Sequence, residues 1–256
     1  MVLNIPFGKN KKLQGIVEAV KKDKEILQYW ESANVIAVDR MKINDHGKVH
    51  AAIVANIALR LLRLLVEAGL EPSIVKDHGM KPEDAEVVVV LAGLLHDIGH
   101  AVHRKNHASF SIVLASDVLD RLLKNFYSHR ERIIIKNEVL HAIISHHVEY
   151  KPLTLEAGCV RVADSLDAKE GRARIPFELG RISIHSVSAM AIKDIKIRKG
   201  QAVPIAIEII MKNSAGIFQV DELIKAKLRD SGLEDYIELK ATIKGEEEKI
   251  VKEFRL

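Results

Sequence analysis

Apolar residues recur at helical spacing through the first two thirds of the chain. Residues 48–68 place Ile53, Val54, Ile57 and Leu61 at three- and four-residue steps, and Gly69 follows the segment. This is the period of one buried face of an α-helix, and glycine is a common residue just past a helix end. The same spacing predicts three later helices, over 107–126, 133–147 and 156–168.

The segment "KPEDAEVVVVLAGLLHDIGH", residues 81–100, is more strongly apolar than its neighbours. Pro82 stands near its start, and acidic residues follow in the first turns, which is typical of a helix N-terminus. Taken alone, "EVVVVL" is also compatible with a strand. Because the apolar run continues into "LAGLLHDI" without a turn signal, we predict a buried helix.

After about residue 180 the period of the pattern shifts to two. Alternation at Ile182 and Ile184, at Ile195 and Ile197, and in "PIAIEIIMK" and "YIELKATIK" predicts strands. Between the last two, "QVDELIKAKLRDSGL" has a helical apolar face that stops at Gly232. The sequence therefore predicts a mainly α protein, with an all-helical domain over 1–179 followed by a small α+β domain over 180–256.

This second domain is expected to lack chemistry of its own. A small sheet covered by one helix leaves a face or an edge that must be hidden. We therefore expect residues 180–256 to pack on the helical domain and to help form a homodimer.

Composition limits the cellular compartments and the classes of binding partner that fit the chain. The chain has 256 residues, 48% of them hydrophobic, and its single cysteine, Cys159, excludes an internal disulfide. The N-terminus lacks the apolar segment of a signal peptide, so we expect a cytoplasmic protein without a membrane span. The 39 basic and 35 acidic residues are scattered and aromatic residues make up 4%, so we do not expect nucleic-acid binding. Abundant Lys and Glu with few Gln are typical of thermophile proteins.

Potential metal ligands recur at apolar helical positions, where ionisable side chains are costly to bury. A lone histidine at such a position is more often a hydrogen-bonded structural residue than a ligand. A set of ligand-type residues spread over separate helices instead favours a bound divalent metal. The set is His50, His96, Asp97, His107, His146 and Asp164, with His46, His100, His141 and His147 close by in the sequence.

These residues resemble a known family pattern. His50, the "HD" pair at 96–97 and Asp164 in "RVADSLDA" are similar to the H…HD…D signature of the HD-domain metal-dependent phosphohydrolases. The resemblance covers roughly residues 40–175. It implies an all-helical domain in which His50, His96, Asp97 and Asp164 bind a divalent metal.

Two further segments resemble family members that hold two metals. "HASFSIVLA" begins with His107 and has the small Ser111 four positions on, and "AIISHHVE" contains His146. By this resemblance, His107 and His146 would join Asp97 around a second metal, with Asp97 as the bridge.

The likeness does not identify the substrate. The DGxGYP motif of the cyclic-dinucleotide phosphodiesterases is absent after "HHVEY", where "KPLTLE" follows. "HDIGH" resembles the deoxynucleotide triphosphohydrolases of the same superfamily, but their next motif, GPFSH, is replaced by "AVHRKNH". A small phosphorylated substrate, such as a nucleotide, is expected.

The ligand types suggest the chemistry. Imidazole and carboxylate groups suit Mn, Fe, Co, Ni, Zn or Mg, in one or two ions per chain. We expect a water of lowered pKa at this site to attack phosphorus in line with the departing oxygen. His100 either protonates the leaving group or binds a phosphate oxygen; a purely structural role is an equal alternative.

Several residues are candidates for substrate contact. His46 stands four residues before His50, and "DAKEGRAR" supplies Lys169, Arg172 and Arg174. Arg172 is the candidate phosphate clamp, because guanidinium matches phosphate oxygens by paired hydrogen bonds. The alternative is that Arg172 lies at a solvated helix end and contacts no substrate. Structural roles are expected for His141, His185 and Cys159.

Two hypotheses compete with an enzyme. An HD domain can serve as a binding or signalling module without catalysis, with the α+β domain as sensor. The presence of all four signature positions favours the enzyme. A role in RNA metabolism would need a contiguous basic face, for which the only support is a sequence pI near 9.0.

Overall fold

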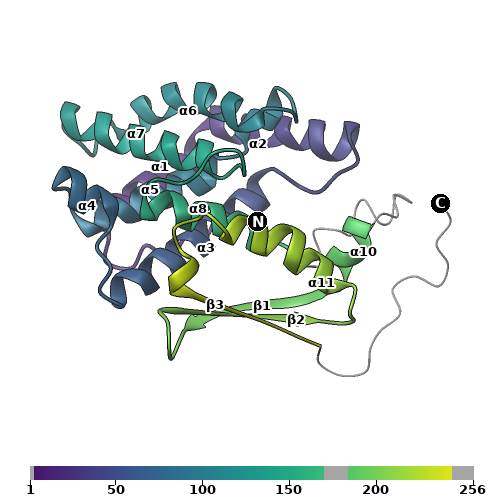
Figure 1. The fold of residues 1–256 in the computed structure, drawn as a ribbon. Helices are drawn as coiled ribbons and strands as arrows, with labels where there is room; N and C mark the ends of the chain where they lie inside the picture. The colour runs from purple at the N-terminus through teal and green to yellow at the C-terminus, as the bar shows by residue number, and fades with distance from the viewer. Residues whose placement is uncertain (1–2, 170–183, 244–256) are drawn as a thin grey trace.

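The computed structural model describes residues 3–169 and 184–243 of the chain (Figure 1). The first stretch is helical. Its elements are α1 (Lys11–Lys22), α2 (Lys24–Asn34), the π-helical η1 (Val35–Arg40), α3 (Lys48–Glu67), α4 (Ser73–His78), α5 (Pro82–Leu95), the 3-10 turn η2 (Ile98–Ala101), α6 (His107–Leu123), α7 (His129–Ser145) and α8 (Leu155–Leu166).

The second stretch is mixed. Its elements are α10 (Ile184–Met190), β1 (Ile192–Lys199), β2 (Ile205–Met211), α11 (Gly216–Gln219), the π-helical η3 (Val220–Lys225), α12 (Ala226–Leu228), the 3-10 turn η4 (Glu234–Tyr236) and β3 (Ile237–Ile243). The mainly α architecture with a small α+β part is therefore confirmed.

Helices α3, α5 and α8 form the centre of the helical part. From Val87 onward α5 is buried on all sides, which explains its uniformly apolar sequence. Gly93 permits its close crossing with α3, because a Cβ atom there would lie 2.7 Å from the Cα of Ala55. Helix α3 is long and apolar enough to cross a membrane, but half of that stretch is buried inside the fold, where α3 packs on α5 and α8.

The sheet has the order β1-β2-β3 in the described part of the chain. β1 and β2 are antiparallel, whereas β2 and β3 are parallel. A parallel pair needs a crossover, which α11, η3 and α12 provide as one helical stretch. This stretch lies between the sheet and the helical part, where η3 and α12 contact α8 (Figure 1). The α+β part thus packs on the helical part, as expected; the homodimer stays a prediction.

Several boundaries differ from the sequence expectation: the helix predicted over 107–126 ends at Leu123, and the helical stretch predicted to stop at Gly232 ends at Leu228. The strand predicted at Ile184 is wrong, because Ile184 begins α10, while Ile182 lies outside the described residues. Helix α5 ends at Leu95, so His96 and Asp97 follow the helix. Helix α7 begins before residue 133, because Ser128 and Glu131 form a reciprocal capping box at its start.

Candidate metal centre

The six predicted ligands converge from five helices. They are His50 on α3, His96 and Asp97 just after α5, His107 at the start of α6, His146 just after α7 and Asp164 on α8. All but the partly buried Asp164 are buried. The structure therefore brings together every ligand that the sequence pattern proposed.

One group faces the Oδ2 atom of Asp97. The Nε2 atoms of His50 and His96 lie 3.3 and 3.4 Å from this oxygen. Asp164 closes the group, with its Oδ1 atom 3.2 Å from His50 Nε2 and 3.7 Å from His96 Nε2. Two imidazoles and two carboxylates converging in this way could hold a divalent metal ion.

A second group faces the other oxygen of the same carboxylate. His107 Nε2 lies 3.4 Å and His146 Nε2 lies 3.7 Å from Asp97 Oδ1. The two Nε2 atoms are 3.1 Å apart, and His100 Nε2 is 3.6 Å from the same oxygen. The Asp97 carboxylate therefore lies between two sets of imidazole nitrogen atoms, one at each of its oxygens.

The histidine rings are oriented by their far nitrogen atoms. In each ring Nδ1 is engaged with an oxygen, which directs Nε2 toward the cluster. The Nδ1 partners are Asp167 Oδ2 for His50 (2.7 Å), the Gly93 carbonyl for His96 (2.9 Å), the Arg104 carbonyl for His107 (3.0 Å) and the Ile143 carbonyl for His146 (2.6 Å).

The loop after α5 is locked against α6. A Cβ atom at Gly99 would lie 2.0 Å from the His107 carbonyl oxygen, so a glycine is needed at this crossing. The Gly99 N–H donates to Ser111 Oγ at 2.8 Å. The small residue in the "HASFS" motif thus holds Asp97 and His107 in a fixed relation.

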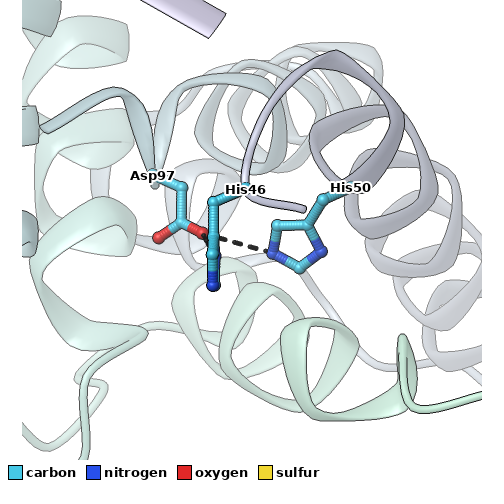
Figure 2. A group of neighbouring side chains, drawn as sticks. All are labelled: His46, His50 and Asp97. Atoms are coloured by element: carbon cyan, nitrogen blue, oxygen red, sulfur yellow. Dashed lines mark hydrogen bonds and ion pairs between the residues drawn. The ribbon is translucent and has the colours of Figure 1, made fainter. Parts of the chain in front are cut away.

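His46 lies outside α3 but still reaches the centre. Gly47 is the N-cap of α3, and Asp45 accepts a hydrogen bond from the His50 N–H at 3.0 Å. His46 Nδ1 lies 2.7 Å from Asp97 Oδ2, so His46 and His50 approach the same carboxylate (Figure 2). His46 contacts a ligand residue here, and its contact with substrate stays a prediction.

His100 is completely buried next to His46. Their rings stack with centroids 4.3 Å apart, and Arg104 Nη1 lies 3.0 Å from His100 Nε2. His100 Nδ1 has no hydrogen-bond partner among the described residues. Burial lowers the pKa of His100 to about 2, so the ring is neutral and accepts from Arg104. The role of His100 as the proton donor to the leaving group stays a prediction.

The ionisable groups of the centre differ in pKa. Burial alone would lower the pKa of His96, but Asp97 and Asp164 outweigh it and raise that pKa to about 9. For His146, burial dominates and the pKa lies well below its ordinary value. Burial alone would raise the pKa of Asp97, but the charges of His96 and its neighbours hold it well below the ordinary range.

The remaining candidates are less central. His141 Nε2 accepts from the Leu153 N–H at 3.0 Å, which suits a structural role. Cys159 is fully buried, and burial raises the pKa of its thiol. Lys169 Nζ lies 2.6 Å from Asp194 Oδ1, in an ion pair with β1. Outside the described residues lie Arg172, Arg174 and the side chain of His185.

Two residues at the centre were not assigned from the sequence. Asp167, three residues after Asp164 in the "RVADSLDA" segment, holds the His50 ring. Lys227, from the α+β part, forms an ion pair with Asp164 Oδ2. The three-residue step from Asp164 to Asp167 was a usable signal for Asp167, whereas Lys227 has no local signature.

Comparison with known proteins agrees with this geometry. The family model of the HD domain matches residues 47–169, a span that contains all six ligand candidates. The chain belongs to the HD-domain family. This HD-domain chain is also 41% identical over 247 residues to an uncharacterized protein of Methanocaldococcus jannaschii, covering 95% of each protein.

More local matches come from Ribonuclease Y. The enzyme of Thermoanaerobacter pseudethanolicus is 34% identical over 88 residues, and that of Thermotoga maritima is 37% identical over 82 residues. The chain spans only 15% and 14% of these two proteins. No solved structure gives a significant match to the chain. These comparisons place the chain in a superfamily of metal-dependent hydrolases.

Proposed function

We propose that this HD-domain protein is a metal-dependent phosphohydrolase that uses water to cleave a small phosphate ester or nucleotide phosphate. The observation that carries the proposal is the Asp97 carboxylate, whose two oxygens face separate sets of imidazole Nε2 atoms. Divalent metal bound in this arrangement would polarise the phosphoryl oxygens and supply hydroxide at neutral pH.

The protein's own residues would bind and orient the substrate. The hydrogen bonds at Nδ1 of the four candidate ligand histidines hold their Nε2 atoms toward Asp97. Arg104 places an exposed guanidinium beside His100, where it can contact a phosphate oxygen. Lys169 and Arg172 remain proposed substrate contacts.

A metal-resolved substrate screen tests the proposal. The full chain, purified without chelator, is analysed for metal and then assayed with Mn, Co, Ni, Zn, Fe and Mg supplied separately. The substrates are nucleoside mono-, di- and triphosphates, deoxynucleoside triphosphates, dinucleoside polyphosphates and cyclic nucleotides. We expect metal-dependent turnover that is absent in Asp97→Ala. Metal binding without turnover on any substrate would instead favour a non-catalytic HD module.

RNA is the second candidate substrate. The observation that favours it is the local likeness to Ribonuclease Y across the HD segment. A single-stranded oligoribonucleotide, tested beside the mononucleotides at equal metal, separates the two candidates. Cleavage of the oligonucleotide with no mononucleotide turnover would favour the RNA alternative.

A further inference from the structure

Helix α8 meets the α+β part along one line of its surface. Gly158, Arg161 and Asp164 stand at three-residue steps, so they lie on the same face of the helix. At Gly158 the approach is close, since a Cβ atom there would lie 2.5 Å from the Ser231 carbonyl oxygen. Only a glycine admits this contact without displacing the partner backbone.

Arg161 fixes the chain that passes over this face. It is 3% exposed, and its guanidinium donates to the carbonyls of Lys227 (3.1 Å), Arg229 (3.4 Å) and Tyr150 (3.1 Å). A buried charge is costly unless hydrogen bonds satisfy it, so these carbonyls are held firmly. Two of the three belong to the end of the crossover stretch, on either side of Leu228.

The third residue on this line, Asp164, receives the side chain that Arg161 positions. Lys227 Nζ pairs with Asp164 Oδ2, and both side chains are largely buried, at 12% and 16% exposed. The other oxygen, Oδ1, faces His50 at 3.2 Å. The two oxygens of Asp164 are thus divided between a lysine on one side and the ligand histidines on the other.

We propose that Lys227 is a positioning residue for the metal ligand Asp164, so that the α+β part is a component of the metal centre. By engaging Oδ2, Lys227 prevents the carboxylate from rotating away and presents Oδ1 to the ion. The arrangement parallels Asp167, which holds the far nitrogen of His50. This inference rests on the metal centre alone and does not depend on which substrate is cleaved.

Metal titration of the full-length protein tests it directly. Chelator-treated wild type, Lys227→Met, Lys227→Arg and Lys225→Met are titrated with Co²⁺ by calorimetry, and the cobalt absorption spectrum is recorded. Lys225 is the matched control, because it lies on the same helical stretch in an exposed pair with Asp221 (2.8 Å). Circular dichroism and the melting temperature of the metal-free proteins report whether each variant is folded.

We expect Lys227→Met to weaken Co²⁺ binding by the group that contains Asp164 about 10- to 100-fold and to change the cobalt spectrum. Lys227→Arg should restore most of the affinity, because it keeps a cation within reach of Oδ2. Lys225→Met should match wild type.

Equal or tighter Co²⁺ binding by folded Lys227→Met, with an unchanged spectrum, would overturn the proposal. Such a result would mean that the Lys227 ammonium group only fills the position that the metal ion takes beside Asp164. If Lys227→Met does not fold, Lys227→Arg decides: wild-type spectrum and affinity support the proposal, and a loss as large as that expected for Met opposes it. Because no substrate is used, these outcomes are independent of the proposed phosphohydrolase activity.

Discussion

The two sides of the Asp97 carboxylate are built differently. On the Oδ2 side, Asp164 adds a second carboxylate and Asp167 a third, behind His50. On the Oδ1 side, His107 and His146 are backed by backbone carbonyls, which carry no formal charge. A divalent ion is attracted by negative charge, so the Oδ2 side should bind its ion with higher affinity than the Oδ1 side. One shared carboxylate can therefore serve two sites of graded affinity.

The histidine pKa values follow the same division. His96, beside both Asp97 and Asp164, has its pKa raised despite burial. Burial lowers the pKa values of His107 and His146: the charge of Asp97 does not compensate at His107, and the charges of Asp164 and Asp97 together do not compensate at His146. His96 also hydrogen-bonds both Asp97 and Asp164, and this direct contact accounts for the opposite direction of its pKa shift.

The largest expected effect comes from the group that both sides share. Asp97→Asn keeps the shape of the side chain but removes the charge, so both metal ions and all hydrolysis should be lost while the protein stays folded. Metal content, turnover and circular dichroism are measured together. Asp117→Asn, an exposed position on α6, is the control and should behave as wild type. Activity in Asp97→Asn above a tenth of the control would remove this centre from consideration.

The next effect separates the two sides. His146→Gln should reduce the metal content of well-loaded protein from about two ions per chain to about one, and the retained ion should be the tighter one. His50→Gln should instead remove the tighter binding step. Calorimetric titration of both variants gives the stoichiometry and the affinity of each step. If wild type binds a single ion, His107 and His146 return to a structural role.

A smaller effect is expected from the residue behind His50. Asp167→Asn leaves all ligands present but weakens the hold on the His50 ring, so the tighter affinity should fall about 10- to 100-fold. The weaker step, which depends on the Oδ1 side, should change little. Asp221→Asn, in an exposed ion pair with Lys225, provides the control in the same titration. Equal losses in both steps would show that the two sides are not independent.

The set of candidate ligands that the fold brings together could be found from the sequence because each motif is local. His96 and Asp97 are adjacent, and the other ligands stand at recognisable places on separate helices. The end of α5 at Leu95 could not be predicted, since it depends on the contact of Gly99 with α6. The alternation of apolar and polar residues around Ile184 gave a wrong strand prediction, because a pattern of a few residues fits a short helix as well as a strand.

Lys227 shows a different limit on what can be predicted from the sequence. It stands 63 residues beyond Asp164, and nothing in "IKAKLRD" marks this lysine among its neighbours. Its position at the metal centre depends on the packing of the crossover stretch between the sheet and α8. Such a contact follows from the tertiary fold alone, which is why residues 180–256 were expected to take no part in the site.

The smallest predicted effect is on the pH dependence of stability in the metal-free protein, where the two sides should act in opposite directions. Burial lowers the folded-state pKa values of His100, His107 and His146, so below about pH 6.5 the unfolded chain binds protons that the folded chain does not. Stability should therefore fall as the pH falls below that value. The folded-state pKa of His96 is raised to about 9, so its stabilisation is complete below about pH 6.5 and is lost as the pH rises through 9.

The melting temperature of chelator-treated protein should thus be highest near pH 6.5 and decline on both sides. Scanning calorimetry between pH 5 and pH 9.5 measures both limbs. His146→Gln should flatten the acid limb, because glutamine does not titrate, and should leave the alkaline limb due to His96 in place. A melting temperature that rose steadily toward acid would contradict the assignment of neutral imidazoles to the Oδ1 side.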